Sequence, residues 1–444
     1  MFGLTVSDAV SICNGIFNSE ANLDEEIIKI VIDSRSANKG DLFVAYKGEK
    51  SDGHDYIRAA FDNGATAALA ERIPEGLESM PIILVDNVQV ALESLIKAFR
   101  QCIDCPVIGV TGSVGKTTTK EMISSVLSNC ANVCKTEGNY NNLIGVPMSM
   151  SSINQDHDVA VIEMGISIPG EMNRLAAMVH PTIMVYTNIG HAHLEFLGSL
   201  DGVFNEKICA VNFMHDNGIL VMNGDDPYFR NYNCKQTKVL YGTNDGCDVV
   251  ASNIIEDENI HISLDIAYKD RSIHVCIPVF GRQMVYAALA AAAVGFVMGL
   301  NDDEIVSGIN NFRNVGRRSL VESTGYITLI DDTYNSNLDS CKSSIDSFVR
   351  IPGRHVAILG DFLEQGEYSV EQHKEIGDYA RSLGVESIIG VGEFGKYISD
   401  VFYLNTDALI PDLPELINKE DIVLVKASRG VHLDTVSDAL KKLS

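Results

Sequence analysis

The chain has no tryptophan, only 7% aromatic residues, and far fewer positive than negative charges. Its 444 residues include 34 lysines and arginines against 60 aspartates and glutamates, which gives a formal net charge of −26 at pH 7. A surface this acidic repels nucleic acids and anionic membranes, so neither is expected as a partner. An anionic substrate has to be bound by local lysines, arginines and helix N-termini.

Long apolar runs, a signal segment and a paired cysteine framework are also lacking. The longest apolar run, Val285 to Leu300, is rich in alanine and short for a membrane span, so it predicts a buried helix. Residues 1–8 contain neither a basic region nor an apolar signal core. The cysteine pairs Cys102-x-x-Cys105 and Cys130-x3-Cys134 have no second half at metal-binding spacing. We therefore expect reduced thiols and a cytoplasmic protein without membrane insertion.

The length and the 46% hydrophobic content predict more than one compact domain. Residues 1–104 alternate short strands with helices, which predicts a small α/β domain. Residues 105–315 alternate apolar strands with helical segments, the pattern of a mostly parallel, doubly wound sheet. Residues 316–444 repeat this pattern as a smaller Rossmann-like unit. The main strands of the last two blocks are expected at 107–110, 159–162, 183–187, 219–222, 327–330, 355–359, 387–391 and 422–425.

The clearest motif is a glycine-rich loop at residues 109–119, Gly-Val-Thr-Gly-Ser-Val-Gly-Lys-Thr-Thr-Thr. An apolar strand enters it and a helix-compatible run leaves it, as in a phosphate-binding P-loop. The match is imperfect because Val110 stands where the pattern has its first glycine. Lys116 can reach the terminal phosphates of a nucleotide, and Thr117 can hold Mg²⁺. The residues expected to contact the nucleotide here are Gly112, Ser113, Gly115, Lys116, Thr117 and Thr118.

Polar residues follow two other apolar strands of the second block. Glu163 ends the strand at 159–162, where an acidic residue can bind Mg²⁺ beside a P-loop. His191 and His193 follow the strand at 183–187. They are either metal ligands or loop histidines that bind backbone, since such loops meet at the carboxyl edge of the sheet.

The third block offers polar residues at its start. Asp331 and Asp332 follow a strand, where they can receive ribose hydroxyls, position phosphate or cap the helix that begins near Ser340. Arg317 and Arg318 lie at the boundary between the second and third blocks. An arginine there can swing onto a phosphate when domains close; the alternative is a solvated linker pair.

Together these residues resemble the Mur ligase family, and the resemblance covers essentially the whole chain. Single motifs of this kind are common, but their order and spacing over three blocks are specific. The motifs are Asp33-Ser-Arg35, Gly40-Asp-Leu-Phe-Val-Ala45 and Asp52-Gly-His-Asp55, then the P-loop, 136–147, Glu163-Met-Gly165, Gly170-Glu-Met172 and 188–198, and finally Gly316-Arg317, 331–337, Leu359-Gly-Asp361 and Lys426-Ala-Ser-Arg-Gly430.

The resemblance implies an ATP-dependent amide ligase of peptidoglycan precursor synthesis with ATP and Mg²⁺ as cofactors. In the family members that this chain resembles most, ATP phosphorylates the terminal carboxylate of UDP-N-acetylmuramoyl-tripeptide. The amine of D-alanyl-D-alanine then attacks the acyl phosphate, and ADP and phosphate leave. The resemblance further implies a first domain that binds the uridine nucleotide, a central ATP-binding domain, and a third domain that closes on ATP and the amine. We expect the protein to act as a monomer.

The resemblance also assigns residues to roles. The implied catalytic residues are Lys116, Glu163, His193 and Lys207. The implied Mg²⁺ ligands are Thr117, Glu163, His193 and Lys207. Lys207 aligns with a lysine that family members often carbamylate, and the alternative is a direct salt bridge at the metal site. The third domain is expected to bring Arg317, Asp332 and Asn335 onto ATP. The implied substrate-binding residues are Ser34, Arg35, Asn141, Asn142, Lys426, Ser428 and Arg429.

The chain departs from the family before its alanine-rich helix. The family usually has His-Asn-x-x-Asn-Ala there, whereas residues 281–288 read Gly-Arg-Gln-Met-Val-Tyr-Ala-Ala. Met284 and Ala287 replace two amides that reach the nucleotide, so we expect looser adenine recognition, which Gln283 can restore only in part. Asn205 and Cys209 likewise replace the usual residues around Lys207.

Three alternatives stay open at this point. The first is a Mur-type ligase that uses a different amine or acid in a specialised pathway. The second is a non-catalytic binding protein with the Mur fold, which the lost amides favour and which the retained residues oppose, namely Lys116, Glu163, His193 and Lys207. The third is an unrelated P-loop ATPase, which the motifs of the third block oppose.

Overall fold

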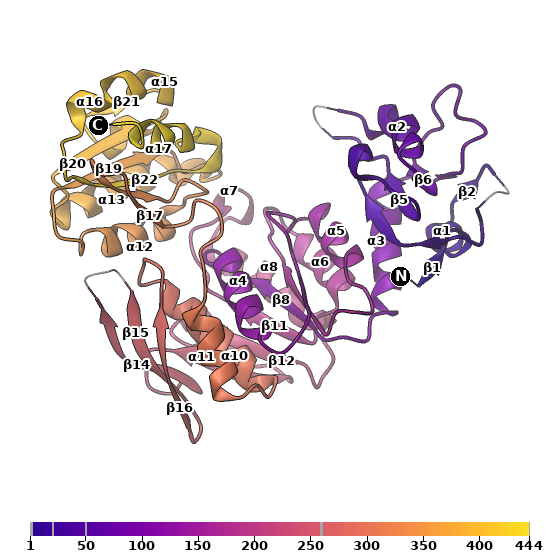
Figure 1. The fold of residues 1–444 in the computed structure, drawn as a ribbon, viewed down its shortest axis with the longest axis horizontal. Helices are drawn as coiled ribbons and strands as arrows, with labels where there is room; N and C mark the ends of the chain where they lie inside the picture. The colour runs from indigo at the N-terminus through magenta and orange to yellow at the C-terminus, as the bar shows by residue number, and fades with distance from the viewer. Residues whose placement is uncertain (1–2, 20–21, 49–50, 258–260, 444) are drawn as a thin grey trace.

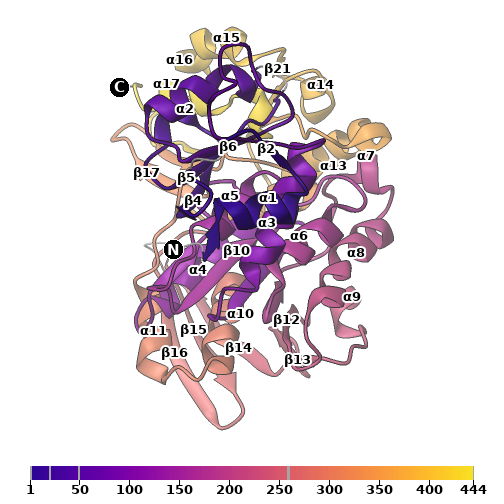
Figure 2. The ribbon, with the colours of Figure 1, turned by 90° about the vertical axis from the view of Figure 1, so that its right-hand side faces the viewer.

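The structure, a computed structural model, describes residues 3–19, 22–48, 51–257 and 261–443. Three sheets of four or more strands follow one another along the chain. In Figure 1 the amino-terminal and carboxy-terminal sheets stand at opposite ends of the central sheet, and Figure 2 shows both above it. The three-part α/β fold expected from the alternation of strands and helices is therefore confirmed.

The amino-terminal part contains a sheet of five strands in the order β2-β7-β6-β5-β4, of which only β2 is antiparallel to its neighbour. Strands β5 and β6 are buried along their whole length, as expected of apolar runs covered on both faces. Helix α3 packs against α5 and α6 of the central part, so one apolar core runs through both parts. The elements of this part are β1 (Leu4–Thr5), α1 (Val6–Cys13), β2 (Ile16–Phe17), β3 (Glu26–Ile27), β4 (Lys29–Val31), β5 (Asp41–Val44), α2 (Ile57–Asp62), β6 (Ala67–Ala70), β7 (Ile82–Leu84) and α3 (Val88–Arg100).

The central part has nine strands in the order β16-β15-β14-β13-β12-β11-β8-β10-β9. The stretch from β9 to β14 is parallel, as predicted, but β14, β15 and β16 extend it as an antiparallel sheet that the apolar runs did not predict. Its strands are β8 (Val107–Thr111), β9 (Val133–Lys135), β10 (Val159–Glu163), β11 (Ile183–Tyr186), β12 (Ile219–Asn223), β13 (Thr237–Gly242), β14 (Val249–Glu256), β15 (Ile262–Tyr268) and β16 (Arg271–Ile277).

The helices of the central part cover both faces of this sheet. The alanine-rich run forms α10, whose residues are almost all buried because its small side chains let the sheet and α4 approach on both sides. The helices are α4 (Lys116–Leu127), α5 (Gly145–Ser151), α6 (Glu171–Val179), α7 (Leu194–Leu197), α8 (Leu200–Ile208), α9 (Pro227–Arg230), α10 (Met284–Val297) and α11 (Asp302–Asn310). None of the helices in the described part of the chain combines the length and the apolar content that crossing a membrane requires.

The carboxy-terminal part has six strands in the order β17-β18-β22-β19-β20-β21, with β17 antiparallel and the others parallel. Apolar clusters fill both faces of this sheet. Its elements are β17 (Leu320–Ser323), β18 (Thr328–Asp331), α12 (Leu338–Phe348), β19 (His355–Gly360), α13 (Ser369–Ser382), β20 (Ser387–Val391), α14 (Gly395–Ile398), β21 (Phe402–Tyr403), α15 (Thr406–Leu409), α16 (Leu413–Leu416), β22 (Ile422–Lys426) and α17 (Asp434–Leu440).

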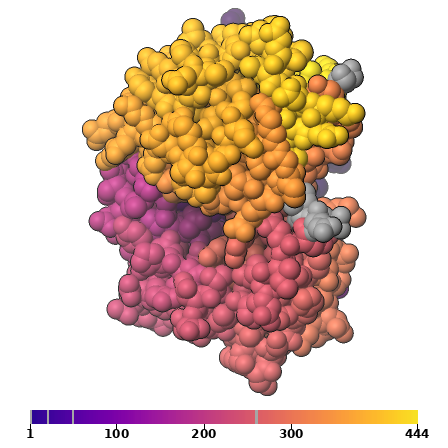
Figure 3. Space-filling view, turned by 90° about the vertical axis from the view of Figure 1, so that its left-hand side faces the viewer, coloured from indigo at the N-terminus to yellow at the C-terminus, as the bar shows by residue number. Residues whose placement is uncertain are grey.

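The two larger sheets bring their strand ends to one place. Strands β8, β10 and β11 are parallel neighbours, so the residues that follow them meet at a single edge. The carboxy-terminal part sits on this edge, and Figure 3 shows it resting on the central part. The loops that follow β18 and β22 therefore face the P-loop across the boundary between the two parts.

Candidate active site

The P-loop has the conformation that a phosphate cradle requires. A Cβ at Gly112, whose φ is +150°, would come within 1.9 Å of the Thr187 hydroxyl, so only glycine fits there. Asn188 anchors the loop, since its backbone oxygen and side-chain oxygen accept from Ser113 and Val114 at 2.9 Å each. Helix α4 begins directly after the loop and directs its free N–H groups into it.

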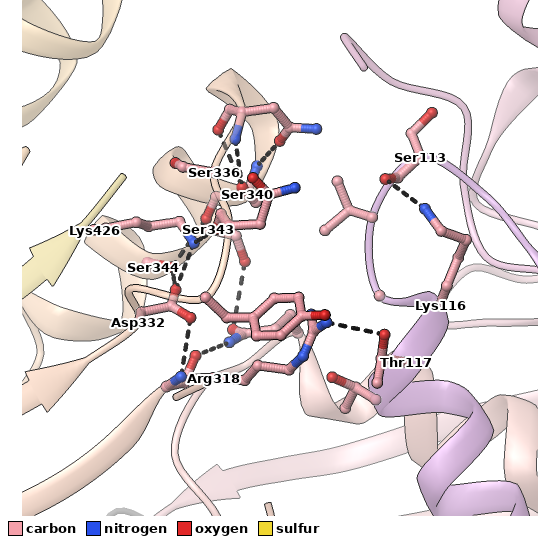
Figure 4. A pocket seen from close by; sticks show the side chains of 18 of the residues that line it. Ser113, Lys116, Thr117, Arg318, Asp332, Ser336, Ser340, Ser343, Ser344 and Lys426 are labelled. Carbon is pink, nitrogen blue, oxygen red and sulfur yellow. Dashed lines mark hydrogen bonds and ion pairs between the residues drawn. The ribbon is translucent and has the colours of Figure 1, made fainter. Parts of the chain in front are cut away.

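Lys116 folds back over its own loop. Its Nζ donates to the backbone oxygen of Gly112 at 2.8 Å. It also donates to that of Ser113 at 3.3 Å, as Figure 4 shows. Burial lowers the pKa of Lys116, and the nearby carboxylate of Glu163 opposes this shift. The lysine is thus a cation held over the loop by weak carbonyl partners, which phosphate oxygens can replace.

Glu163 lies at the end of β10 beside the first turn of α4. Its Oε1 accepts hydrogen bonds from the Thr117 hydroxyl at 3.1 Å and from Nδ2 of Asn141 at 2.8 Å. Its buried Oε2 has no hydrogen-bond partner within the described residues. A hydroxyl and a carboxylate with an unused oxygen are the hard oxygen ligands that Mg²⁺ prefers, so these residues fit that ion.

Lys207, near the end of α8, is the second buried group without a partner. The residue is only 1% exposed, and its Nζ makes no hydrogen bond to any described residue. Burial, and then the positive charge of Lys116, hold the pKa of Lys207 well below its ordinary value. An unpaired ammonium is costly to bury, so this site fits a neutral or modified amine, or a bound partner.

The opposite wall of the site comes from the carboxy-terminal part. Oδ2 of Asp332 accepts from Nζ of Lys426 at 2.7 Å and from the Ser344 hydroxyl at 2.6 Å, while Oδ1 accepts from the backbone of Ser319 at 2.9 Å. Lys426 also donates to the backbone oxygen of Asn335 at 3.1 Å. Asp332 therefore fixes the wall and has both oxygens occupied in this structure.

Of the two arginines at the boundary, Arg318 faces the P-loop and Arg317 does not. Arg317 turns back into the carboxy-terminal part, where it donates to Asp331 at 3.0 Å and to Asp438 at 2.8 Å. Nη2 of Arg318 donates to the Thr117 hydroxyl at 3.0 Å (Figure 4). The guanidinium of Arg318 also lies 3.7 Å from the ring centroid of Tyr334. In this structure Arg318 lines the cavity beside the P-loop, and Arg317, which was expected to reach ATP, does not.

Two adjoining cavities occupy the boundary. The smaller, about 200 Å³, lies between the P-loop and the wall of Asp332 and Lys426. The larger, about 640 Å³, continues along α10 past Gln283 and Ser343, which line both cavities. Together they offer a continuous space that begins beside the P-loop and extends along α10.

The replaced amide positions line these cavities. Met284 contributes to the smaller cavity and Ala287 to the larger. The amide of Gln283 is already engaged: Nε2 donates to the Ser319 hydroxyl at 3.2 Å and Oε1 accepts from the Ser343 hydroxyl at 3.4 Å. Gln283 therefore links α10 to the carboxy-terminal part and, in this conformation, is not free to bind adenine.

Comparison with known proteins identifies the family. The Mur ligase middle domain matches residues 110–295, the Mur ligase family catalytic domain matches 26–100, and the Mur ligase glutamate ligase domain matches 316–429. UDP-N-acetylmuramoyl-tripeptide–D-alanyl-D-alanine ligase of Bacillus subtilis is 32% identical, over 98% of each chain. The chain belongs to the Mur ligase family. The ligase of the same name from Escherichia coli is also 32% identical to this Mur ligase, over 100% of this chain and 99% of its own.

Solved structures agree with this assignment. A crystal structure of MurF from Acinetobacter baumannii superposes with a TM-score of 0.90 at 28% identity, covering 99% of this chain and 98% of its own. MurF from Thermotoga maritima, solved in complex with ADP, has a TM-score of 0.83 at 29% identity, covering 93% of this chain and 97% of its own. This Mur ligase thus has the fold of these proteins over nearly its whole length.

One predicted metal ligand of this Mur ligase, His193, lies apart from Thr117 and Glu163 in this structure. His193 lies outside the cavity that Thr117 and Glu163 line, and its Nδ1 is 2.5 Å from Glu364 of the carboxy-terminal part. His191 likewise pairs with Asp339 at 3.0 Å. Within the described residues, no three histidine, cysteine, aspartate or glutamate side chains are grouped to hold a metal ion. The two histidines instead tie the central loop to the carboxy-terminal part.

The predicted substrate residues are also spread out. Asn141 joins Glu163 in the cavity, but Asn142 caps α5 by accepting from the backbone of Gly145 at 2.8 Å. Ser428 is buried and donates to the backbone oxygen of Ser336 at 3.0 Å. In the amino-terminal part, Ser34 is buried and the side chain of Arg35 is 88% exposed, paired with Asp33 alone. Arg429 is exposed near the site, and so is Asn335, which lines the smaller cavity.

Sequence reasoning did not single out Tyr334 or Glu364. Tyr334 belongs to the polar segment after β18 that the sequence did mark, so its place in the motif was the available signal. No local pattern around Glu364 indicates its histidine partner, because that partner lies on a distant loop of the chain. The pairing lowers the pKa of Glu364.

Proposed function

We propose that this Mur ligase uses ATP to join D-alanyl-D-alanine to UDP-N-acetylmuramoyl-tripeptide, releasing ADP and phosphate. Its similarity over the full length to ligases with that activity in their names supports the substrates. One structural observation carries the chemistry. The Thr117–Glu163 pair and the P-loop face Arg318 and Lys426 across a single cavity, so cations from two parts of the chain surround one phosphate-sized space.

ATP fits the two adjoining cavities in one orientation, with its phosphates in the smaller cavity and its nucleoside in the larger one. Its phosphates belong beside the P-loop, where Lys116 and the N-terminus of α4 supply positive charge. Its nucleoside then extends into the larger cavity, beside Tyr286 and Ala287 of α10. Tyr286 is held there by its hydroxyl, which donates to Asp225 at 3.0 Å.

Mg²⁺ fits beside the phosphates. Thr117 and Glu163 would hold it, and the unpartnered Oε2 of Glu163 gives it a free ligand atom. When bound, the ion neutralises phosphate charge. Arg318 donates to the Thr117 hydroxyl in this structure, so its guanidinium lies beside the residues that would hold the ion. Because Arg318 lines the smaller cavity, its guanidinium can bind a phosphate there.

The reaction brings two anions together, and the residues of the chain reduce their repulsion. A carboxylate oxygen of the tripeptide attacks the terminal phosphorus of ATP, and the bond to ADP breaks. The amine nitrogen of the dipeptide then attacks the acyl carbon, loses a proton, and phosphate leaves. Lys116 and Arg318 stabilise the charge that develops on the transferred phosphoryl group, in a space from which closure excludes water.

The three parts divide the substrates among them in this proposal. Residues 1–104 bind the uridine nucleotide through Ser34 and Arg35, residues 105–315 bind ATP, and residues 316–444 close on ATP and bind the amine through Arg429. Lys426 and Ser428 shape that wall through Asp332 and Ser336. One chain supplies every part of this site, so we propose a monomer. Its nucleotide substrates and 10 free cysteines support a cytoplasmic location.

Phosphate release tests this function. The purified chain is supplied with ATP, Mg²⁺ and UDP-N-acetylmuramoyl-tripeptide, with and without D-alanyl-D-alanine. We expect sustained release only when both substrates are present, together with one ligated product per phosphate. Release that needs another amine or acid would indicate a different Mur-type ligase, and ATP binding without release under any combination would indicate a binding protein.

A further inference from the structure

Tyr334 lines the smaller cavity and lies beside two arginines, Arg318, which also lines this cavity, and Arg429, which is exposed next to it. The loop between β18 and α12 carries this half-buried tyrosine. Its ring centroid lies 3.7 Å from Cζ of Arg318 and 5.6 Å from Cζ of Arg429, both within cation–π range. Arg318 reaches the P-loop side of the cavity through Thr117, whereas Arg429 is exposed on the carboxy-terminal side.

Two hydrogen bonds tie the loop that carries Tyr334 to the segments that carry the two arginines. The N–H of Tyr334 donates to the backbone oxygen of Arg317 at 3.1 Å, which ties the loop to the segment that carries Arg318. Two residues further on, the backbone oxygen of Ser336 accepts from the hydroxyl of Ser428, the neighbour of Arg429, at 3.0 Å. The ring and both guanidiniums thus belong to one connected unit.

We propose that Tyr334 is a positioning residue that orients Arg318 toward the transferred phosphate and Arg429 toward the carboxylate of the incoming amine. The inference rests on the proposed function and extends it to a residue that links the two anion sites. The negative face of the ring attracts both guanidiniums and limits their rotamers, so neither has to be ordered anew when substrate binds. Its hydroxyl makes no hydrogen bond to any described residue, so the aromatic face is the part that acts.

Steady-state kinetics of three variants tests the proposal. Tyr334→Leu removes the ring, and Tyr334→Phe keeps it. Tyr326→Leu is the matched control: Tyr326 also lies in the carboxy-terminal part, but it packs against an apolar cluster there. We expect Tyr334→Leu to raise KM for ATP and for D-alanyl-D-alanine by about 2- to 30-fold. KM for the UDP-linked substrate stays within about twofold of the wild-type value, because neither arginine binds that substrate. Tyr334→Phe restores most of both losses, and Tyr326→Leu shows neither.

A double variant separates positioning from a general structural effect. Arg429→Gln raises KM for the dipeptide by itself, and adding Tyr334→Leu then changes that KM little further, because both act through one guanidinium. Independent, multiplying effects would overturn the inference, as would equal losses in Tyr334→Phe and Tyr334→Leu.

Thermal unfolding of each variant completes the test. If Tyr334→Leu does not fold, Tyr334→Met removes the ring with a more flexible side chain. Unfolding of both would assign the ring to stability and overturn the inference. A wild-type chain without turnover would instead contradict the proposed function, so the two failures are distinguishable.

Discussion

Arg318 donates a hydrogen bond to the hydroxyl of Thr117 at 3.0 Å, and this contact joins the carboxy-terminal part to the first turn of the P-loop helix. The adjacent Arg317 points the other way and pairs with Asp331, which is fully buried. The two neighbouring arginines therefore differ in their contacts: Arg318 faces the P-loop, and Arg317 forms a salt bridge within the carboxy-terminal part.

Replacing each arginine by glutamine distinguishes a role in ATP use from a role in stability. Arg318→Gln is expected to lower kcat/KM for ATP by about 10- to 100-fold with an unchanged melting temperature, because a charged contact to phosphate is lost. Arg317→Gln leaves Asp331 without its ion-pair partner and is expected to destabilise the protein by about 3 kcal/mol. Kinetics and thermal unfolding measure both effects. A loss of ATP use confined to Arg317→Gln would contradict this division.

Lys116→Ala is expected to abolish ligation in a folded protein. Removing a cation from a triphosphate site costs several kcal/mol of transition-state stabilisation, on the order of 10³-fold or more in rate. The product assay measures the rate, and circular dichroism checks the fold. Lys269→Ala, a change in the turn between β15 and β16, serves as a control with normal turnover. Wild-type turnover by Lys116→Ala would refute the role of this lysine.

Lys207 is expected to carry a carbamate. Its buried Nζ has no partner within the described residues, and its pKa is well below the ordinary value, so the amine can react with carbon dioxide. Growth of a carbonyl signal in ¹³C NMR on adding labelled bicarbonate, absent in Lys207→Ala, would show it. Small carboxylic acids should restore part of the activity of Lys207→Ala. A signal of equal size in both proteins would place the label elsewhere.

Restoring the lost amides should strengthen nucleotide binding. Met284→Asn with Ala287→Asn places two amides on the walls of the cavities, and one bidentate base contact is worth about 1–3 kcal/mol of discrimination. Calorimetry is expected to show tighter ATP binding and a preference for ATP over GTP that rises roughly tenfold or more. Unchanged affinity would mean that the base is held elsewhere, by residues of the carboxy-terminal part such as Ser343 and Arg350 of the larger cavity.

The parallel strands could be predicted closely because they are buried on both faces and therefore read as unbroken apolar runs. The run at 107–110 became β8, which ends one residue later. Strand β16 could not be found this way, since its buried positions alternate with exposed ones such as His274. The alternation of Ile273, Val275 and Ile277 with more polar residues was the available signal, and the strand pairs with β15.

The site was predictable where local sequence determines it and not where distant partners do. The P-loop, Thr117 and Glu163 meet because parallel strands must bring their ends together. Arg317 and Arg318 lie in a bend between α11 and β17, with positive φ at Gly316 and Ser319, so the local sequence could not decide which arginine faces the P-loop. The partner that turns Arg317 away from the site is Asp438 of α17, which accepts a hydrogen bond from its guanidinium.

The route of one oxygen atom tests the central claim most directly. UDP-N-acetylmuramoyl-tripeptide labelled with ¹⁸O in its terminal carboxylate is ligated to D-alanyl-D-alanine with unlabelled ATP, and the released phosphate is analysed by mass spectrometry. Because the carboxylate attacks the terminal phosphorus and phosphate later leaves with the attacking oxygen, we expect one labelled oxygen in each phosphate and one in the new amide. Unlabelled phosphate, or label found in AMP, would contradict the acyl-phosphate account.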